Sequence, residues 1–386
     1  MIELSVSSPY LSTMHLRQLS LVNFKNYADA SIDFDSGVNA FVGNNGTGKT
    51  NLLDAIHYLS LCKSYFSSID GQNIKQHSDF FVIQGIFEQN DREENISCGL
   101  KRGQKKMFRR NAKEYDRLAD HVGLLPVVMI SPTDTSLITE GSEERRKFPD
   151  SIISQFDRYY LEQIINYSRA LLQRNTYLKQ AAQSKKFDPE AIVLWNDQLV
   201  ISGRQIHAAR RKFLEDLLPI FRHYYQFITN GKETVDIRYE SQLNNHEFES
   251  LLGSSLDRDR LFQHTTTGPH KDDLLFIIEN FPVKRYASQG QQKSFLIALK
   301  LAQFDYVKKQ KGVKPILLLD DIFDKLDDSR VGKLMELVSN DNFGQIFITD
   351  THPERLHSIF QNIGVPIRTF PVKDGEVVSQ MINQGN

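Results

Sequence analysis

The chain has 386 residues, which is too long for a single ordinary core and predicts two to three domains. Hydrophobic residues make up 40% of it and charged residues 25%, a balance that excludes an intrinsically disordered chain. The formal net charge of -1 excludes a general attraction to polyanions, so any contact with nucleic acid would need a local basic patch.

The two cysteines, Cys62 and Cys98, lie far apart and outside any CxxC or His-rich segment. We therefore expect buried free thiols, with neither a zinc site nor a disulfide framework. The N-terminus has no basic stretch followed by an apolar one, and no apolar run is long enough to span a bilayer. The expected location is cytoplasmic, with no membrane partner, and residues 1–13 are expected to precede the fold.

The regular pattern begins with alternating apolar and polar residues at 15–24 and 30–34, the period of half-buried strands. A strand at 39–42 then leads into a glycine-rich loop, and apolar residues between 52 and 61 recur at helical spacing. Strand, loop and helix thus follow in the order that a nucleotide-binding unit requires. Two antiparallel strands are expected next, at 80–87 and 95–100.

From about residue 143 to 227 the periodicity is that of long helices, interrupted at Pro189, Gly203 and Pro219. This segment is predicted to be a helical domain inserted between two halves of one sheet. The elements expected beyond it are strands at 235–239, 273–279, 315–319 and 344–349 and a helix at 288–308. The predicted fold class is α/β, a mixed sheet with helices plus an inserted helical arm.

Residues 43–50, Gly-Asn-Asn-Gly-Thr-Gly-Lys-Thr, fit the pattern G-x-x-x-x-G-K-[ST] at every fixed position. Glycines allow backbone amides to approach phosphates, and the N-terminus of the following helix favours an anion. Lys49 is expected to neutralise the β- and γ-phosphates of ATP, and the Thr50 hydroxyl to bind Mg²⁺. The nucleotide contacts predicted from this segment are Gly43, Asn44, Asn45, Gly46, Thr47, Gly48, Lys49, Thr50 and Asn51.

A second motif is the apolar run at 315–319 that ends in Asp320 and Asp321. A buried strand that delivers two acids beside a phosphate loop predicts a magnesium carboxylate next to a general base. We assign Asp320 to Mg²⁺ and Asp321 to the attacking water. Taken alone, the run could equally be a strand edge with a polar end.

A third motif, Ser288-Gln289-Gly290-Gln291-Gln292, opens an apolar helical pattern. It would create a second anion-receiving helix N-terminus, although one ATP does not need two such sites from one chain. Without further information the segment is also explained by an ordinary helix cap.

Together these segments resemble the ABC-type ATPase heads of RecF, Rad50 and SMC proteins, and most closely the RecF family. The resemblance extends from residue 14 to about 355, and the insert is too short and too broken for the coiled coils of Rad50 and SMC proteins. Further segments that match the RecF pattern are LSLVNFKNY at 19–27, KSYF at 63–66, SPTD at 131–134, RRKFPD at 145–150, GPHKDDL at 268–274 and ASQGQQKSFLIALKLAQ at 287–303.

The resemblance implies an ABC-type head in two halves, 14–140 and 266–386, separated by an inserted helical arm at 141–265. It also implies that two heads dimerise around ATP, with Ser288, Gly290 and Gln291 acting on the nucleotide held by the partner. Asp327 would lie in the D-loop, the ABC segment that follows the acidic strand.

The sequence departs from the family pattern in two places. Asp324-Lys325 stands where RecF proteins usually have Ser-Glu. His352 is either a contact to the γ-phosphate or only a histidine at the start of a helix before Pro353. No Q-loop glutamine, the ABC residue that links nucleotide to the rest of the head, can be assigned, and its expected neighbourhood is 130–134.

Residues 101–117 contain eight basic side chains against the two acids Glu114 and Asp116. Such a run suits contact with DNA phosphates, although a solvated hairpin face would also explain it. The residues assigned to DNA are Lys101, Arg102, Lys105, Lys106, Arg109 and Arg110.

The resemblance implies an ATP-dependent DNA-binding protein of repair and replication with weak ATPase activity. It would clamp gapped, junction or duplex DNA as a homodimer and act with RecO- and RecR-like partners in recombinase loading. Two alternatives are a transporter-type ABC subunit and a nucleotide-binding scaffold with negligible turnover, the latter because Asp321 replaces the more common glutamate.

Overall fold

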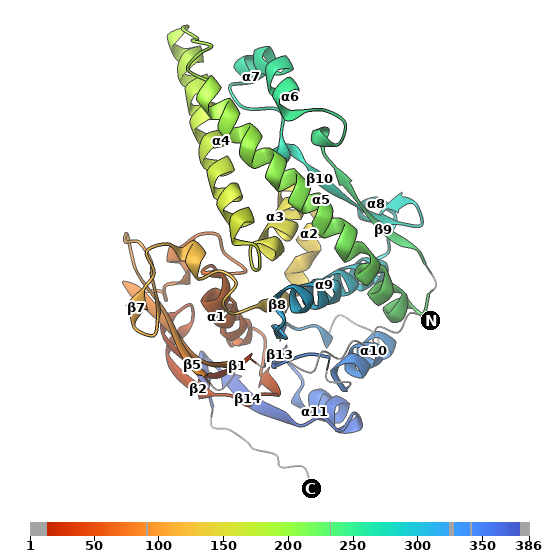
Figure 1. Ribbon diagram of the computed structural model, residues 1–386. Coiled ribbons are helices and arrows are strands. Elements are labelled where there is room, and N and C mark those ends of the chain that lie inside the picture. The colour runs from red at the N-terminus through yellow and green to blue at the C-terminus, as the bar shows by residue number, and fades with distance from the viewer. Residues whose placement is uncertain (1–13, 90–91, 232, 324–327, 340–341, 379–386) are drawn as a thin grey trace. The chain divides into compact units, whose positions relative to one another are not determined.

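A computed structural model describes residues 14–89, 92–231, 233–323, 328–339 and 342–378 (Figure 1). The chain forms two compact units. The first contains residues up to 134, residues 227–229 and residues from 296 onward, and the second contains residues 135–226 and 230–295. The domain limits expected from the sequence, at residues 140 and 265, stay a prediction.

One sheet of the first unit is antiparallel and has the strand order β2-β1-β4-β5-β6-β7. Its long strands alternate buried and more exposed side chains, as strands with one buried face do. The strands expected at 80–87 and 95–100 are confirmed as β4 and β5, paired in antiparallel register. The strands are β1 (Met14–Phe24), β2 (Tyr27–Asp33), β4 (Phe80–Gln89), β5 (Arg92–Lys101), β6 (Met107–Arg110) and β7 (Lys113–Glu114).

The other sheet of this unit is mainly parallel and has the order β15-β14-β3-β13-β12-β8. The strands β3, β8, β12 and β13 are buried along their whole length, which accounts for their mostly apolar sequences. Strand β3 pairs with β13 and β14 from the other end of the chain, as the predicted split sheet requires. The strands are β3 (Val38–Val42), β8 (Val127–Ile130), β12 (Ile316–Leu319), β13 (Ile346–Asp350), β14 (Ile367–Lys373) and β15 (Glu376–Val377).

Helix α1 (Lys49–Leu61) shares one hydrophobic core with residues of both sheets. Its buried side chains include Leu52, Leu53, Ile56 and Leu59, the residues whose helical spacing predicted it. This packing fixes the loop that joins β3 to α1. Both cysteines are buried and free, as expected. The other helices that lie wholly in the first unit are α10 (Asp328–Ser339) and α11 (Pro353–Asn362).

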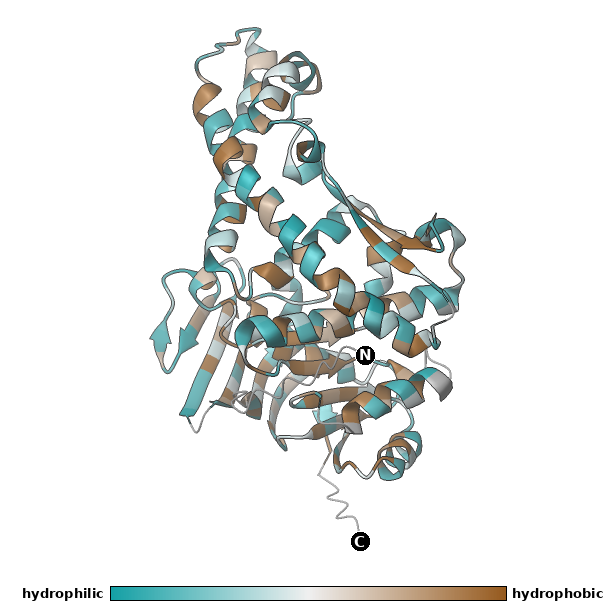
Figure 2. Ribbon diagram, turned by 45° about the vertical axis from the view of Figure 1, so that its right-hand side comes forward, coloured by the Kyte–Doolittle hydropathy of each residue, from teal (hydrophilic) through white to brown (hydrophobic). Residues whose placement is uncertain are grey.

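The second unit is dominated by the long helices α4 (Arg158–Ser184) and α5 (Val193–Thr229). The last three residues of α5 belong to the first unit. These helices contact each other through Arg174, which donates a 2.8 Å hydrogen bond to Asn196. Their residues alternate between hydrophilic and hydrophobic, as in amphipathic helices (Figure 2). Beside them lie α2 (Ser136–Thr139), α3 (Ser142–Ile153), α6 (Phe248–Ser254), α7 (Leu256–Phe262) and α8 (Val283–Tyr286), with a small sheet of β9 (Val235–Glu240), β10 (Asp273–Ile278) and β11 (Phe281–Pro282).

The interruptions predicted at Gly203 and Pro219 are wrong, because α5 continues through both residues. A Cβ at position 203 would lie 2.5 Å from the ring of Phe248, so glycine permits close packing there and does not end the helix. Helix α9 (Gln289–Lys311) begins in the second unit and continues in the first. Across the described residues, no helix has both the length and the apolar character needed to cross a membrane.

Candidate functional site

The loop at 43–50 connects β3 to α1 in the first unit, between a strand and a helix as predicted. Gly43, Gly46 and Gly48 have φ values of 155°, 81° and 112°, which side chains disfavour. A Cβ on Gly43 would lie 2.3 Å from the backbone oxygen of Val372, and one on Gly48 would lie 2.4 Å from the side-chain nitrogen Nδ2 of Asn26. The shape of the loop therefore requires these glycines.

Lys49 is the first residue of α1, and only 4% of it is exposed. Its ammonium group donates hydrogen bonds to the carbonyl oxygens of Gly43, at 2.7 Å, and Asn44, at 3.0 Å. A helix N-terminus carries partial positive charge and free amide donors. The cation and the helix end thus serve the same loop, a combination suited to a polyphosphate.

Two residues that sequence reasoning did not assign hold the loop in place. Asn26 donates to the carbonyl of Thr47 at 2.9 Å and accepts from the side chain of Asn51 at 2.7 Å. The Tyr27 hydroxyl donates to the carbonyl of Gly48 at 3.1 Å. Both belong to the segment LSLVNFKNY, whose match to the RecF pattern was the only signal that could have identified them.

The acidic pair at the end of β12 lies beside this loop. The Thr50 hydroxyl donates to Oδ1 of Asp320 at 2.7 Å, and Thr349 donates to the same oxygen at 3.0 Å. Asp321 follows with a φ of 43°, in the left-handed region that aspartate tolerates better than most residues, and its amide donates to Thr349 at 2.8 Å. The first unit therefore brings together Lys49, Thr50 and both aspartates.

The geometry of Thr50 and Asp320 suits magnesium bound to a nucleotide. Magnesium is usually held by one or two carboxylates together with substrate phosphates, and seldom by an all-protein cage. The described part of the chain has no group of three or more His, Cys, Asp or Glu side chains that could hold a metal by itself. One carboxylate and one hydroxyl at the phosphate loop fit the nucleotide-dependent kind of site.

The Ser288 segment belongs to the second unit and opens α9 with a capping box. The Ser288 hydroxyl accepts from the amide of Gln291 at 3.2 Å, and Oε1 of Gln291 accepts from the amide of Ser288 at 2.7 Å. Gln291 also donates to Glu233 at 2.7 Å, and Glu233 accepts from the Tyr225 hydroxyl at 2.6 Å. Both ends of the Gln291 side-chain amide are thus hydrogen-bonded, while Gly290 adds no side chain to the first turn.

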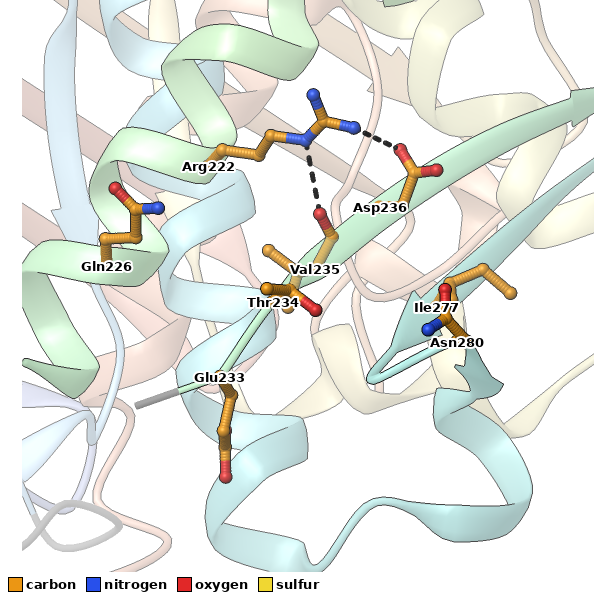
Figure 3. Close-up of a pocket in the computed structure, with 8 residues that line it drawn as sticks. All are labelled: Arg222, Gln226, Glu233, Thr234, Val235, Asp236, Ile277 and Asn280. Atoms are coloured by element: carbon orange, nitrogen blue, oxygen red, sulfur yellow. Dashed lines mark hydrogen bonds and ion pairs between the residues drawn. The ribbon is translucent and has the colours of Figure 1, made fainter. Parts of the chain in front are cut away.

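Glu233 also lines a pocket of about 310 Å³ in the second unit (Figure 3). Arg222 crosses this pocket and donates to Asp236 at 2.9 Å. This ion pair neutralises both charges within the pocket wall.

His352 occupies the position before α11, directly ahead of Pro353. Its Nδ1 lies 2.8 Å from the Thr351 hydroxyl, and its amide donates to the buried Asp350 at 2.7 Å. The geometry accounts for a helix-start histidine, and a role toward nucleotide stays a prediction. Asp327 and the Asp324-Lys325 pair lie outside the described residues.

The predicted DNA residues lie on the β5-β6 segment but differ in their surroundings. Lys106 pairs with Asp70 at 2.8 Å, and Arg110 makes two hydrogen bonds to Glu94 at 2.6 and 2.7 Å. These bonds from Arg110 lower the pKa of Glu94. The other four, by contrast, have exposed side chains: Lys101, Arg102, Lys105 and Arg109. A contact with DNA stays a prediction, and it rests mainly on these four residues.

Comparisons of the sequence with a family model and with known proteins agree with one another. Residues 15–372 match the family described as RecF/RecN/SMC N terminal domain. The chain is 53% identical to DNA replication and repair protein RecF of Flavobacterium johnsoniae, over 92% of this chain and 99% of that protein. It is 47% identical to the protein of the same name from Phocaeicola vulgatus, over 95% of this chain and 99% of that one.

Solved structures give the same result for the fold. A structure described as recombination mediator protein RecF with ATP has a TM-score of 0.86 and 29% identity, and the match covers 96% of this chain and 98% of that one. An Smc head domain from Pyrococcus furiosus has a TM-score of 0.56 at 17% identity over 96% of both chains, a likeness of fold alone. The ABC-type head fold with a helical region is thereby confirmed.

Proposed function

The chain belongs to the RecF family of DNA replication and repair proteins, and on that premise we propose that it is an ATP-dependent DNA-binding protein of recombinational repair. The observation that supports this most directly is the 2.7 Å hydrogen bond from Thr50 to Asp320. It joins the phosphate loop to an acidic strand from the other end of the chain, as a magnesium-nucleotide site requires. ATP itself is named in a solved structure of a relative.

Each residue of this site has a proposed role. Lys49 neutralises charge on the β- and γ-phosphates, while Thr50 and Asp320 hold Mg²⁺. When bound, ATP would supply the hydrolysable phosphate, and Mg²⁺ would supply positive charge that offsets the negative phosphate oxygens. Asp321, fixed through its amide to Thr349, orients the attacking water. Asp327 and His352 complete the nucleotide contacts.

We further propose that two chains close around ATP as a homodimer. Ser288, Gly290 and Gln291 stand at the N-terminus of a 23-residue helix, which favours an anion at that end. The phosphate loop already supplies one such helix end to the nucleotide of its own chain. The second helix end, that of α9, has a function if it contacts the nucleotide held by the partner.

Sedimentation velocity tests this proposal, with the full chain, ATP, Mg²⁺ and DNA. We expect a monomer without ATP and a dimer with it. Ser288→Arg should still bind ATP but stay monomeric, because the arginine side chain blocks the helix end. Ser184→Arg, at an exposed position on α4, should dimerise normally. A monomeric wild-type chain at saturating ATP and Mg²⁺ would contradict the homodimer.

The proposed DNA ligand is gapped or junction DNA together with its duplex arms, held by the exposed basic side chains of the β5-β6 segment. RecO- and RecR-like proteins are the proposed partners, since solved relatives are described as part of a RecFOR pathway. Binding of gapped, duplex and single-stranded DNA, with and without ATP at two salt concentrations, tests the DNA preference. Co-sedimentation with RecO- and RecR-like proteins tests the partners.

A nucleotide-binding scaffold with little turnover is a second candidate, because Asp321 is one methylene shorter than the glutamate common at this position. Phosphate release by the wild-type chain and by Asp321→Asn separates the two functions. A weak ATPase loses most of its activity in the variant. A scaffold releases phosphate at the same background rate in both.

A further inference from the structure

Three segments that match the RecF pattern have no role in the proposed site: KSYF at 63–66, SPTD at 131–134, and the body of helix α9 beyond its first turns. In the first unit they meet at the side chain of Asp134. Tyr65 comes from the first segment, Ser131 and Asp134 from the second, and Lys300 from α9. These four residues bring together two charged groups and two hydroxyl groups, and all of them except the half-buried Tyr65 are buried.

Asp134 is the centre of this cluster, and both of its oxygens are occupied. Oδ2 accepts from the amide of Ser131 at 2.8 Å, while Oδ1 lies 2.9 Å from Nζ of Lys300 and accepts from the Tyr65 hydroxyl. Lys300 also donates to the Tyr65 oxygen at 2.9 Å. Asp134 and Lys300 are each only 5% exposed. Together with the half-buried Tyr65 they form a closed triangle of side chains, which we call the latch.

The protonation of Tyr65 fixes the direction of these hydrogen bonds. Burial and the neighbouring Asp134 hold the pKa of Tyr65 well above its usual value. The phenol therefore keeps its single proton, donates it to Asp134 and accepts from Lys300 through its oxygen. Each hydrogen bond within the latch thus joins a donor to an acceptor.

The latch is anchored to the phosphate-loop helix on one side. Asp54 of α1 is fully buried and accepts from the Ser64 hydroxyl at 2.7 Å and from the amide of Tyr65 at 2.6 Å. Lys25 lies 2.5 Å from the same carboxylate and neutralises it. The position of Tyr65 is thus set by the helix that begins at Lys49.

On its other side the latch reaches the magnesium carboxylate. The Ser131 hydroxyl donates to Oδ2 of Asp320 at 3.1 Å, whereas Thr50 and Thr349 bond to Oδ1. Because Asp134 holds the backbone of Ser131, it determines where that hydroxyl lies. Asp134 therefore acts on Asp320 through Ser131.

A buried ion pair adds little to stability compared with apolar residues of the same size. An aspartate and a lysine at this place are better explained by a need for defined geometry, which charged and hydrogen-bonded groups provide. Lys300 also lies on the helix that Ser288 opens, about three turns further along. The latch is thus a contiguous network between the magnesium carboxylate and that helix.

We propose that Asp134 is a positioning residue for magnesium-bound ATP, and that with Tyr65 and Lys300 it ties Asp320 to helix α9. The inference rests on the proposed ATP site. Its consequence is that the latch governs how much Mg²⁺ strengthens ATP binding, while the phosphate loop alone sets binding without Mg²⁺.

Isothermal titration of the full chain with ATP, in Mg²⁺ and in EDTA, tests the latch. For Asp134→Asn we expect wild-type ATP affinity in EDTA. The factor by which Mg²⁺ strengthens ATP binding should be about tenfold smaller than in the wild type, because one hydrogen bond to a charged group is lost. Equal Mg²⁺ gains in the variant and the wild type would overturn the latch. A wild-type chain that binds no ATP would instead overturn the proposed function, and the latch with it.

A double variant separates positioning from stability. Asp134→Asn leaves the Lys300 charge buried without its partner and should lower the melting temperature. Adding Lys300→Met removes that charge, so the melting temperature should recover while the Mg²⁺ defect remains. Recovery of both would show a merely structural role. As a matched control, Asp259→Asn breaks the buried pair with Arg174 in the second unit and should lower the melting temperature without changing the Mg²⁺ gain.

Discussion

The Thr50 hydroxyl donates a 2.7 Å hydrogen bond to Asp320, although 270 positions separate the two residues. Thr50 lies in the first turn of the helix after the phosphate loop, and Asp320 directly follows a strand from the opposite end of the chain. Thr349 completes the arrangement by donating to the same carboxylate oxygen. The hydroxyl and the carboxylate proposed for Mg²⁺ are therefore held at bonding distance by the protein fold itself.

Replacing Thr50 with valine keeps the side-chain shape and removes only the hydroxyl. We expect Thr50→Val to bind ATP about tenfold more weakly in Mg²⁺, the cost of one hydrogen-bonding group at a charged ligand. Affinity in EDTA should change little. Titration calorimetry measures both, and Thr139→Val, at an exposed position, is the control. Equal losses with and without Mg²⁺ would argue against the metal role of Thr50.

Two glycines at opposite ends of β3 give a matched test of the loop. Gly43→Ala should lower ATP affinity at least about tenfold, because its Cβ would meet the backbone oxygen of Val372 at 2.3 Å and the loop would have to shift. Gly37→Ala should bind ATP normally, since nothing lies within 4 Å of its Cβ. Fluorescence titration with an ATP analogue measures both variants. Normal binding by Gly43→Ala would contradict the proposed phosphate loop.

The sequence predicted the phosphate loop, the acidic strand and the split sheet because each has a local pattern: glycine spacing, an apolar run and a change of period. The supports of the loop have no such pattern. Asn26 reaches Thr47 only after the chain has turned through β2 and β3, and no spacing rule connects the two positions. Likewise, Asp134 and Lys300 meet only in the folded core.

Helix α5 and the basic hairpin show where local patterns mislead. Gly203 and Pro219 disfavour a helix by propensity, yet α5 continues through both. Gly203 lies close to Phe248, and the exposed Pro219 is flanked by the fully buried Leu217 and Phe221, whose packing holds this part of the helix. Arg110 is basic in a basic run, but the register of β5 and β6 places it beside Glu94. Charge in the sequence does not reveal which cations are already paired.

This pairing divides the basic hairpin into two groups that mutation can separate. Replacing Lys101, Arg102, Lys105 and Arg109 together with glutamine should weaken DNA binding on every sequence and reduce its salt dependence. The slope of log K against log salt should fall by about 0.9 for each DNA phosphate that the variant no longer neutralises. Filter binding of duplex DNA at several salt concentrations measures this slope. An unchanged slope would support the alternative of a solvated hairpin face.

The paired residues serve as the comparison. Arg110→Gln leaves Glu94 without its bidentate partner, so we expect a loss of about 0.2–1 kcal/mol of stability, the usual range for a pair near the surface. Its salt slope for DNA should stay close to that of the wild type. If the slope instead falls by about 0.9, the amount expected for one phosphate, Arg110 leaves Glu94 to bind DNA.

His270 should make the second unit sensitive to acid. Burial lowers its pKa to about 4, against the ordinary value of about 6.5 that an unfolded chain gives. Its Nδ1 lies 2.7 Å from the Tyr167 hydroxyl and its Nε2 lies 3.0 Å from the carbonyl of Thr265. The neutral ring makes both hydrogen bonds, because Nε2 donates to the Thr265 carbonyl and Nδ1 accepts from the Tyr167 hydroxyl. A second proton, on Nδ1, would point at the hydroxyl proton of Tyr167 and break that hydrogen bond.

The direction of the pH effect follows from proton counting. Between about pH 6.5 and 4 the unfolded state binds a proton that the folded state does not, so stability falls as the pH drops through this range. At pH 5 the loss relative to pH 7.5 is about 2 kcal/mol from this group. The single tryptophan, Trp195, lies in the second unit and reports the urea unfolding of that unit by fluorescence.

His270→Gln should have a lower free energy of unfolding than the wild type at pH 7.5. Between pH 7.5 and 5 that free energy should fall by about 2 kcal/mol less than in the wild type, whereas the exposed His246→Gln should keep the wild-type dependence of stability on pH. If His270→Gln loses as much stability as the wild type between pH 7.5 and 5, His270 is not the group that takes up the proton.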